Sequence, residues 1–103
     1  MKLDFTHVED TAKGVFLCAT HPNARGRTFN VAYGQSRTLR ELAEIIQRYL
    51  PGTPIQRRPT PRHVPARGTL SIARAKQELG FASSVPLEEG VARYIEHLRA
   101  HSF

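Results

Sequence analysis

The spacing of hydrophobic positions predicts two amphipathic helices in the first half of the chain. Residues 9–20 carry apolar side chains at helical intervals: Ala12, Val15, Phe16 and Ala19. A second helix is expected after Thr38, because Thr38 and Glu41 have the spacing of a capping box, in which each residue bonds the backbone of the other. Pro51 and Gly52 end it. Its apolar stripe consists of Leu39, Leu42, Ala43, Ile46 and Leu50.

Two further helices are expected in the second half. Residues 72–79 follow Ser71, a favourable N-cap, and precede Gly80, which suits the left-handed conformation at a helix end. Residues 87–100 form the last helix. Its expected buried stripe is Leu87, Val91, Ile95 and Leu98.

Alternation of apolar and polar residues, with a period of two, predicts two or three short strands. Residues 2–8 and 27–32 alternate apolar and polar positions, and residues 54–58 form a short extended piece. The prolines at 59, 61 and 65 then keep residues 60–67 irregular. About four helices with two or three short strands fit a two-layer α/β fold, or an α+β fold. So few strands would form a thin sheet with exposed edges.

Length and charge narrow the possible functions. The chain has 103 residues, the size of one small domain. Its formal net charge is +6, and twelve of its 15 basic residues are Arg. This balance favours anionic partners such as phosphorylated small molecules or nucleic acid, and a basic surface without a ligand is the plain alternative. No membrane span or signal peptide is recognisable, so the cytoplasm is the expected location. Cys18 is expected to be a buried small residue.

Three groups of residues could carry chemistry. His7, Glu9 and Asp10 lie close in sequence, but no distant ligand completes a metal set, and we interpret them as a strand end and an acidic first helical turn. His97 and His101 have the i, i+4 spacing of a helical zinc pair, and we interpret them as a solvated helix end. Residues 57–67 contain four Arg between prolines and could bind a diphosphate. Stacking aromatics are missing there, so nucleic acid is the weaker interpretation.

Five segments in order resemble the C-terminal part of the extended short-chain dehydrogenase/reductase family, the NAD-dependent nucleotide-sugar epimerases and dehydratases. Each segment is short, but together they cover nearly the whole chain. They are Asp4-Phe5-Thr6-His7-Val8-Glu9-Asp10, Phe29-Asn30-Val31-Ala32-Tyr33-Gly34, Thr38-Leu39-Arg40-Glu41-Leu42-Ala43, Ser71-Ile72-Ala73-Arg74-Ala75-Lys76-Gln77-Glu78-Leu79-Gly80-Phe81 and Pro86-Leu87-Glu88-Glu89-Gly90.

The resemblance implies a substrate-binding lobe over residues 1–103, with a nucleotide sugar as substrate and NAD or NADP as cofactor of the complete enzyme. In the family, an Arg in the proline-rich loop contacts the nucleotide diphosphate, and Arg62 matches it, with Arg67 as the alternative register. The family's second diphosphate Arg precedes the Asp-Phe pair. Leu3 stands there in this chain, and the neighbouring Lys2 carries the charge. Pro65 replaces a sugar-contacting acid.

The family's catalytic motifs do not occur in the sequence. Its Tyr-x-x-x-Lys pair is missing, because Tyr33, Tyr49 and Tyr94 are followed four residues later by other residue types, and so is the glycine-rich dinucleotide turn. We therefore assign no catalytic, cofactor-binding or metal-binding residue, and expect the Rossmann half to lie upstream of Met1. The alternatives are a separate basic module that binds nucleic acid or a phosphorylated ligand, or a fragment that docks onto a separate Rossmann chain.

Overall fold

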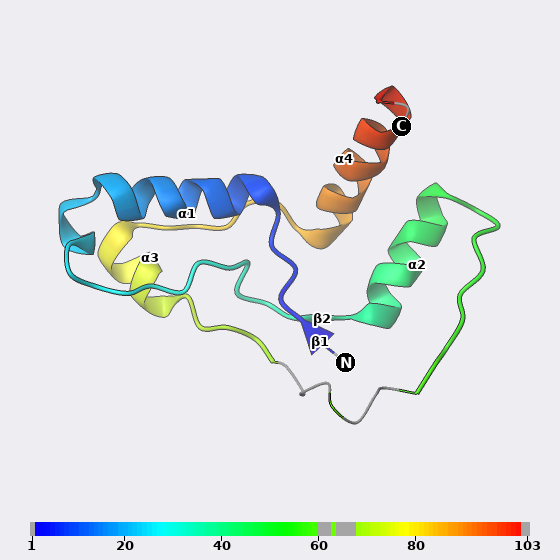
Figure 1. Ribbon diagram of the computed structural model, residues 1–103, viewed down its shortest axis with the longest axis horizontal. Coiled ribbons are helices and arrows are strands. Elements are labelled where there is room, and N and C mark those ends of the chain that lie inside the picture. The colour runs from blue at the N-terminus through cyan, green and yellow to red at the C-terminus, as the bar shows by residue number, and fades with distance from the viewer. Residues whose placement is uncertain (1, 60–62, 64–67, 102–103) are drawn as a thin grey trace.

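The computed structural model describes residues 2–59, 63 and 68–101, which form four α-helices and a two-stranded antiparallel sheet. This confirms the expected partial α/β lobe (Figure 1). In chain order the elements are β1 (Lys2–Leu3), α1 (Val8–Thr20), the 3-10 helix η1 (Pro22–Ala24), β2 (Arg37–Thr38), α2 (Leu39–Tyr49), α3 (Ala73–Leu79) and α4 (Leu87–Ala100).

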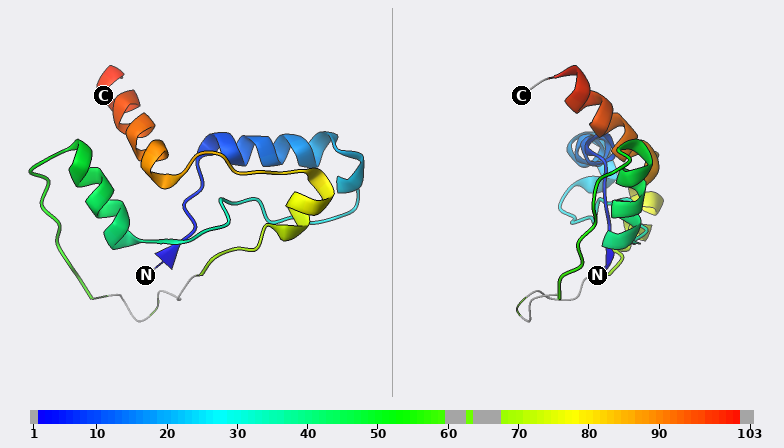
Figure 2. Two further views of the ribbon diagram at one scale, coloured as in Figure 1. Left: turned by 180° about the vertical axis from the view of Figure 1, so that it is seen from behind. Right: turned by 90° about the vertical axis from the view of Figure 1, so that its right-hand side faces the viewer.

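The helices lie in two groups at opposite ends of the molecule. Helix α3 lies with α1 and η1 at one end, and α2 with α4 at the other, while the short β1–β2 pair lies near the junction (Figure 1). The molecule measures 49 × 38 × 21 Å, and its thinness is visible in the side view of Figure 2. Because one dimension is so short, few side chains are fully enclosed.

The helix ends confirm the capping signals read from the sequence. In α2, the Glu41 backbone N–H donates to Thr38 Oγ1 at 3.0 Å, and the Thr38 N–H donates to Glu41 Oε1 at 3.2 Å. Helix α3 ends at Gly80, which has a φ of 68°. Its N-cap is Ile72, not Ser71 as expected, although the Ser71 hydroxyl accepts a hydrogen bond from the Ala73 N–H at 3.5 Å.

The strand predictions were largely wrong. Only Lys2–Leu3 of residues 2–8 is a strand, and it pairs with Arg37–Thr38, which the alternation did not indicate. Residues 27–32 and 54–58 are not strands. A strand needs a hydrogen-bonded neighbour, and none of the described residues provides one for these segments.

The core forms where residues 29–32 pass between α1 and α3. Its buried members are Ala32, Ile72, Ala75 and Phe81, with Leu17, Phe29 and Val31 packed against them. Helix α1 approaches this segment closely at Gly14, where an added Cβ would lie 2.1 Å from Val31 Cγ1. The apolar residues of the expected strand are therefore buried by helices.

The outer face of α1 is apolar and uncovered by any described residue. Val15 and Phe16 are 61% and 65% exposed, although their spacing is typical of a core-facing stripe. The buried positions of α1 are Asp10 and Gly14, on the opposite side of the helix. Cys18 is also exposed, which corrects the expectation of a buried thiol. We call the exposed apolar residues of this face the α1 stripe: Val8, Ala12, Val15, Phe16 and Ala19.

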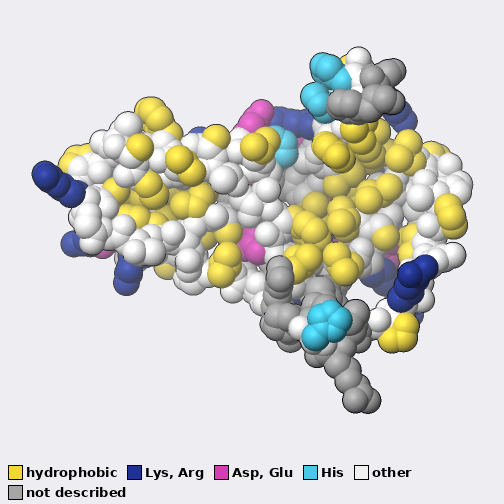
Figure 3. Space-filling view, in the orientation of Figure 1, with side chains coloured by type: hydrophobic (Ala, Val, Ile, Leu, Met, Phe, Trp, Pro, Cys, Tyr) yellow, Lys and Arg dark blue, Asp and Glu magenta, His cyan; other side chains and the backbone are white. Residues whose placement is uncertain are grey.

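A second apolar surface lies at the other end of the molecule. Figure 3 shows hydrophobic side chains gathered over α2 and α4. Leu98, expected in the core, is 40% exposed, and Leu39 is 44% exposed. Ile45 and Ile95 are the buried residues of these two helices. Ile95 belongs to the stripe predicted for α4, whereas Ile45 lies outside the stripe predicted for α2, so the buried face of α2 is rotated from the prediction and that of α4 is not.

The close approach at Gly14 predicts that a larger side chain there is destabilising. Gly14→Leu adds a good helix former, so a loss of stability reports the contact with Val31 and not helix propensity. We expect the free energy of unfolding to fall by about 1–3 kcal/mol, the cost of overpacking a core. Chemical denaturation measures it. Gly68→Leu, where an added Cβ meets nothing within 4 Å, is the control and should have little effect.

Candidate functional site

Asp4 connects the segment after β1 to the turn at residues 33–34. Its carboxylate accepts hydrogen bonds from the backbone N–H groups of Tyr33 at 3.1 Å and Gly34 at 3.0 Å. Thr6 Oγ1 also accepts from the Tyr33 N–H, at 3.1 Å. Gly34 has a φ of 90°, a conformation that favours glycine. Asp4 thus closes a turn that leads directly into β2.

Asp10 connects α1 to the segment that begins α4. It is completely buried. One carboxylate oxygen accepts from the Ser84 N–H at 2.9 Å and the Ser84 hydroxyl at 3.2 Å, and the other accepts from the Val85 N–H at 3.0 Å. Burial by itself raises the pKa of Asp10, but these hydrogen bonds, with a smaller contribution from the Lys13 charge, outweigh it and hold the pKa below its usual value. Asp10 is therefore an ionised, fully bonded structural anchor.

The neighbours of Asp10 have structural roles too, as the sequence indicated for this acidic group. His7 is the N-cap of α1, and its Nδ1 accepts from the Glu9 N–H at 3.1 Å. Glu9 forms an ion pair with Arg93 of α4, at 2.7 Å, and Glu89 pairs with the same guanidinium. These contacts join the start of α1 to the first turns of α4.

Of the three residues predicted to bind substrate, Lys2 is the one that the structure describes, and it lies in the β1–β2 ladder. Lys2 is exposed and pairs with Thr38, and Leu3 pairs with Arg37. Arg37 is partly buried, and its guanidinium donates to Glu41 of α2 and Glu88 of α4, each at 2.5 Å. Both bonds raise the pKa of Arg37, so its charge is permanent.

The basic segment at residues 57–67 is only partly described. Arg62 and Arg67, the predicted diphosphate-binding residues, lie outside the described residues. Arg57 and Arg58 are exposed and line an open groove against α2. Whether Lys2 and Arg62 share one site therefore stays a prediction.

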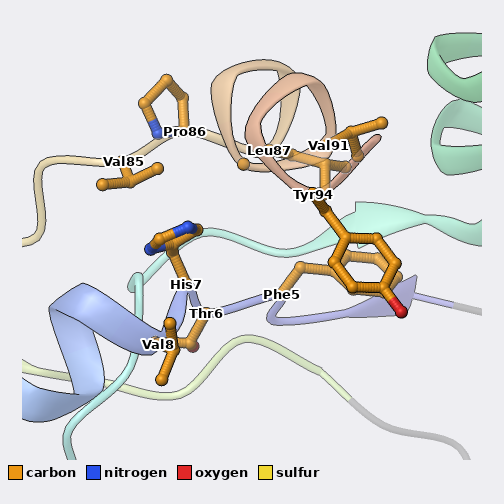
Figure 4. A pocket seen from close by; sticks show the side chains of 10 residues that line it. Phe5, Thr6, His7, Val8, Val85, Pro86, Leu87, Val91 and Tyr94 are labelled. Atoms are coloured by element: carbon orange, nitrogen blue, oxygen red, sulfur yellow. The ribbon is translucent and has the colours of Figure 1, made fainter. Parts of the chain in front are cut away.

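An open apolar pocket of about 520 Å³ lies between the start of α1 and the first turns of α4. Figure 4 shows Phe5, His7 and Val8 on one side and Val91 and Tyr94 of α4 on the other. The ring of His7 packs near Gly90, where an added Cβ would lie 3.3 Å from its Cδ2. Few polar groups line the pocket, so an apolar surface could pack against it.

The described residues contain no metal-binding cluster. No group of three or more His, Cys, Asp or Glu side chains that could hold a metal ion occurs among residues 2–59, 63 and 68–101. His97 and His101 are exposed, and their rings stack with centroids 4.3 Å apart. Within the same part of the chain, no helix is long and apolar enough to cross a membrane.

Sequence reasoning missed Arg37 and the bonding roles of Asp4 and Asp10. Arg37 gains its position by pairing across strands, which the pattern around it did not reveal. The two acids do occupy the Asp positions of the Asp4–Asp10 segment that carries the family resemblance, and this signal could have identified them.

The fold, a small helical lobe with a two-stranded sheet, is also found in larger NAD-binding enzymes. A solved structure of the Bordetella bronchiseptica enzyme WbmF in complex with NAD+ and UDP superposes with a TM-score of 0.79 and 29% identity, covering 97% of this chain and 29% of that one. An Agrobacterium tumefaciens short-chain dehydrogenase/reductase superfamily protein with bound NAD shares the fold at 24% identity, with a TM-score of 0.71, over 97% of this chain and 31% of that one.

Curated proteins give the same result from sequence. The chain is 31% identical to dTDP-4-dehydro-6-deoxyglucose reductase of Escherichia coli over 99 residues, which are 95% of this chain and 31% of that protein. It is 28% identical to UDP-glucuronic acid decarboxylase 1 of Arabidopsis thaliana, over 92% of this chain and 22% of that protein. No family model matches the chain.

These comparisons confirm the resemblance predicted from the sequence. The sequence relatives are a dTDP-4-dehydro-6-deoxyglucose reductase and a UDP-glucuronic acid decarboxylase, the similar solved structures contain NAD, and the chain fits a fragment of an extended short-chain dehydrogenase/reductase. It spans about a third or less of the length of the relatives it matches.

The bonding of Asp10 predicts a stability loss that depends on pH. Asp10→Asn removes the charge and leaves at least one of the two N–H donors unsatisfied, so we expect the free energy of unfolding at pH 7 to fall by about 2–3 kcal/mol. The folded-state pKa is lowered, so Asp10 stabilises the fold above its unfolded pKa of about 3.9, and the contribution is lost as pH falls through the folded value.

Denaturation curves measured between pH 7 and pH 2 check this expectation. The difference in stability between wild type and Asp10→Asn should narrow below about pH 4, where the carboxylate of the unfolded chain protonates while the folded one stays ionised, and should be lost once the folded carboxylate protonates too. The exposed Glu96→Gln is the control. Equal stability of wild type and Asp10→Asn at pH 7 would contradict the assigned role.

Proposed function

We propose that residues 1–103 form the C-terminal substrate-binding lobe of an NAD-dependent epimerase or dehydratase that acts on a nucleotide sugar in the cytoplasm. The main support is the match over nearly the whole chain to dTDP-4-dehydro-6-deoxyglucose reductase and to WbmF, whose structure contains NAD+ and UDP. The order of the five sequence segments agrees with it. In this proposal the lobe forms part of the nucleotide-sugar binding site of the enzyme.

The redox chemistry is supplied by residues outside this chain. The sequence has neither the Tyr-x-x-x-Lys pair nor a glycine-rich dinucleotide turn. The residues present do not fit an NAD site: N–H groups at the starts of α1 and α2 are bonded to His7 and Thr38, and neither start has the glycine turn that lets a diphosphate approach. The lobe alone is therefore inactive in this proposal.

In this proposal two cations bind the diphosphate of the substrate: Lys2 and one Arg of the proline-rich loop, which is Arg62 or Arg67. Arg62 is the positional match to the Arg of the family's proline-rich loop, and Arg67 serves if the loop register differs. Lys2 lies on β1, next to the position where the family has Arg. Guanidinium groups suit this role because their planar donors match phosphate oxygens.

Removing Arg62 should weaken substrate binding in the complete enzyme. With Arg62→Ala, we expect binding of UDP or dTDP to weaken by about 2–3 kcal/mol, the scale of a charge-assisted contact. Isothermal titration calorimetry measures it. Arg48→Ala, an exposed residue near the end of α2, is the control with the same charge change. An unchanged affinity for Arg62→Ala would remove Arg62 from the site.

The lobe docks onto the dinucleotide-binding part of the enzyme through the α1 stripe. Such a continuous apolar face on a helix is normally buried. The relatives contain about two thirds or more of their length beyond the matched region, which provides material to cover it. The opposite side of α1 is already packed against the lobe's own core.

A charge in the α1 stripe should block this docking without unfolding the lobe. Ala12→Glu lies in the exposed stripe, and Ala100→Glu makes the same change at the exposed end of α4. We mix each variant with the part of a relative that the chain does not cover and measure co-elution in size-exclusion chromatography. Ala12→Glu should reduce complex formation at least tenfold and Ala100→Glu should not. Equal behaviour of the two variants would exclude the stripe as the docking face.

A further inference from the structure

We propose that Arg37 is a further diphosphate-binding residue, which supplies from β2 the cation that the family carries at the position of Leu3. This inference rests on the proposed nucleotide-sugar site and adds a residue to it. No sequence motif assigned a role to Arg37, and the sheet pairing suggests it.

The β1–β2 ladder brings position 37 next to position 3. Leu3 and Arg37 are direct partners in an antiparallel pair. Side chains directly opposite each other in such a pair project from the same face, with their Cβ atoms about 4.5–5.5 Å apart. A long side chain at position 37 can therefore reach the space that a long side chain at position 3 would occupy.

The Arg37 guanidinium is held in place by its neighbours. It sits on an element fixed on two sides: Asp4 closes the turn before it, and the Thr38–Glu41 capping box follows it. Nε donates to Glu41 and one Nη2 hydrogen donates to Glu88. A guanidinium has five N–H donors, so three are free of these two bonds and can meet phosphate oxygens.

The charge around Arg37 determines how an anion meets it. The Arg37 side chain is 27% exposed, so an incoming anion can still reach it. Glu41 and Glu88 give the cluster around Arg37 a net charge of −1, and Lys2 does not belong to it, because Lys2 pairs with Thr38 and projects from the other face of the ladder. Glu88 is 39% exposed and free to turn into solvent, which leaves the Arg37 guanidinium paired with Glu41 and open to a diphosphate.

The rival explanation is that Arg37 only clamps α2 to α4 through its two carboxylate partners. The two roles predict different effects of Glu88→Gln on nucleotide affinity. If Arg37 binds phosphate, Glu88→Gln removes a repulsive carboxylate and leaves the cation in place, so nucleotide affinity is kept or increased. If Arg37 is only a clamp, Glu88→Gln breaks the same clamp as Arg37→Ala and both variants lose affinity alike.

The test measures UDP and uridine binding by calorimetry on the complete enzyme. Arg37→Ala should weaken UDP at least tenfold and change uridine less than twofold, because only UDP carries the diphosphate. Arg40→Ala, which removes an exposed Arg paired with Glu44 one turn along α2, should change both less than twofold. Thermal unfolding of each variant shows whether a loss of affinity comes from a loss of stability. Arg37→Lys is measured in the same way as a milder substitution.

A strand-to-strand exchange completes the test. In the Arg37→Leu background, Leu3→Arg restores a guanidinium to the same face of the ladder, and UDP affinity should recover to within threefold of wild type. Arg37 is excluded if Arg37→Ala binds UDP like wild type, if uridine weakens as much as UDP, if Glu88→Gln loses affinity as Arg37→Ala does, or if the exchange fails to restore binding. A wild-type enzyme that does not bind UDP or dTDP would instead overturn the proposed function itself.

Discussion

Two carboxylates in the first ten residues hold the lobe together. Asp4 and Asp10 accept four backbone N–H bonds from segments 29–30 and 74–75 residues further along the chain. A buried carboxylate is costly unless its oxygens are satisfied, and here each oxygen of both acids has an N–H donor. The molecule is thin and encloses few side chains. The hydrogen bonds of Asp4 and Asp10 therefore supply stability that a larger apolar core would otherwise provide.

The two anchors also determine where charge lies in the lobe. Asp4 closes the turn at Gly34, and β2 follows three residues later, so this bond positions Arg37 opposite β1. Asp10 fixes the segment before α4, and this places Glu88 in the first turn of that helix within reach of Arg37. The position of Arg37 opposite Leu3, on which the proposed diphosphate contact rests, is thus a consequence of the same bonds that organise the fold.

The exposed apolar faces agree with a chain that fits a fragment of a larger enzyme. Val15 and Phe16 of α1 are exposed opposite a packed side of the same helix, and residues 27–32, predicted as a strand, have no strand neighbour among the described residues. The first feature leaves apolar side chains at the surface, and the second leaves a predicted strand without a neighbour. Isolated domains usually avoid both. A covering partner would satisfy both.

The four helices, the capping box at Thr38, the stop at Gly80 and the family resemblance could all be predicted from the sequence, because they depend on residues a few positions apart. The sequence could not determine the strands, because pairing depends on a distant partner: the expected strand at residues 27–32 has none here, and Arg37–Thr38 became a strand through β1. Helical spacing indicated the wrong face of α1, since the apolar stripe is exposed and the buried side carries Asp10 and Gly14. The contact of Gly14 with the core and the position of Arg37 opposite Leu3 come from the tertiary structure, because both depend on which segments meet in space.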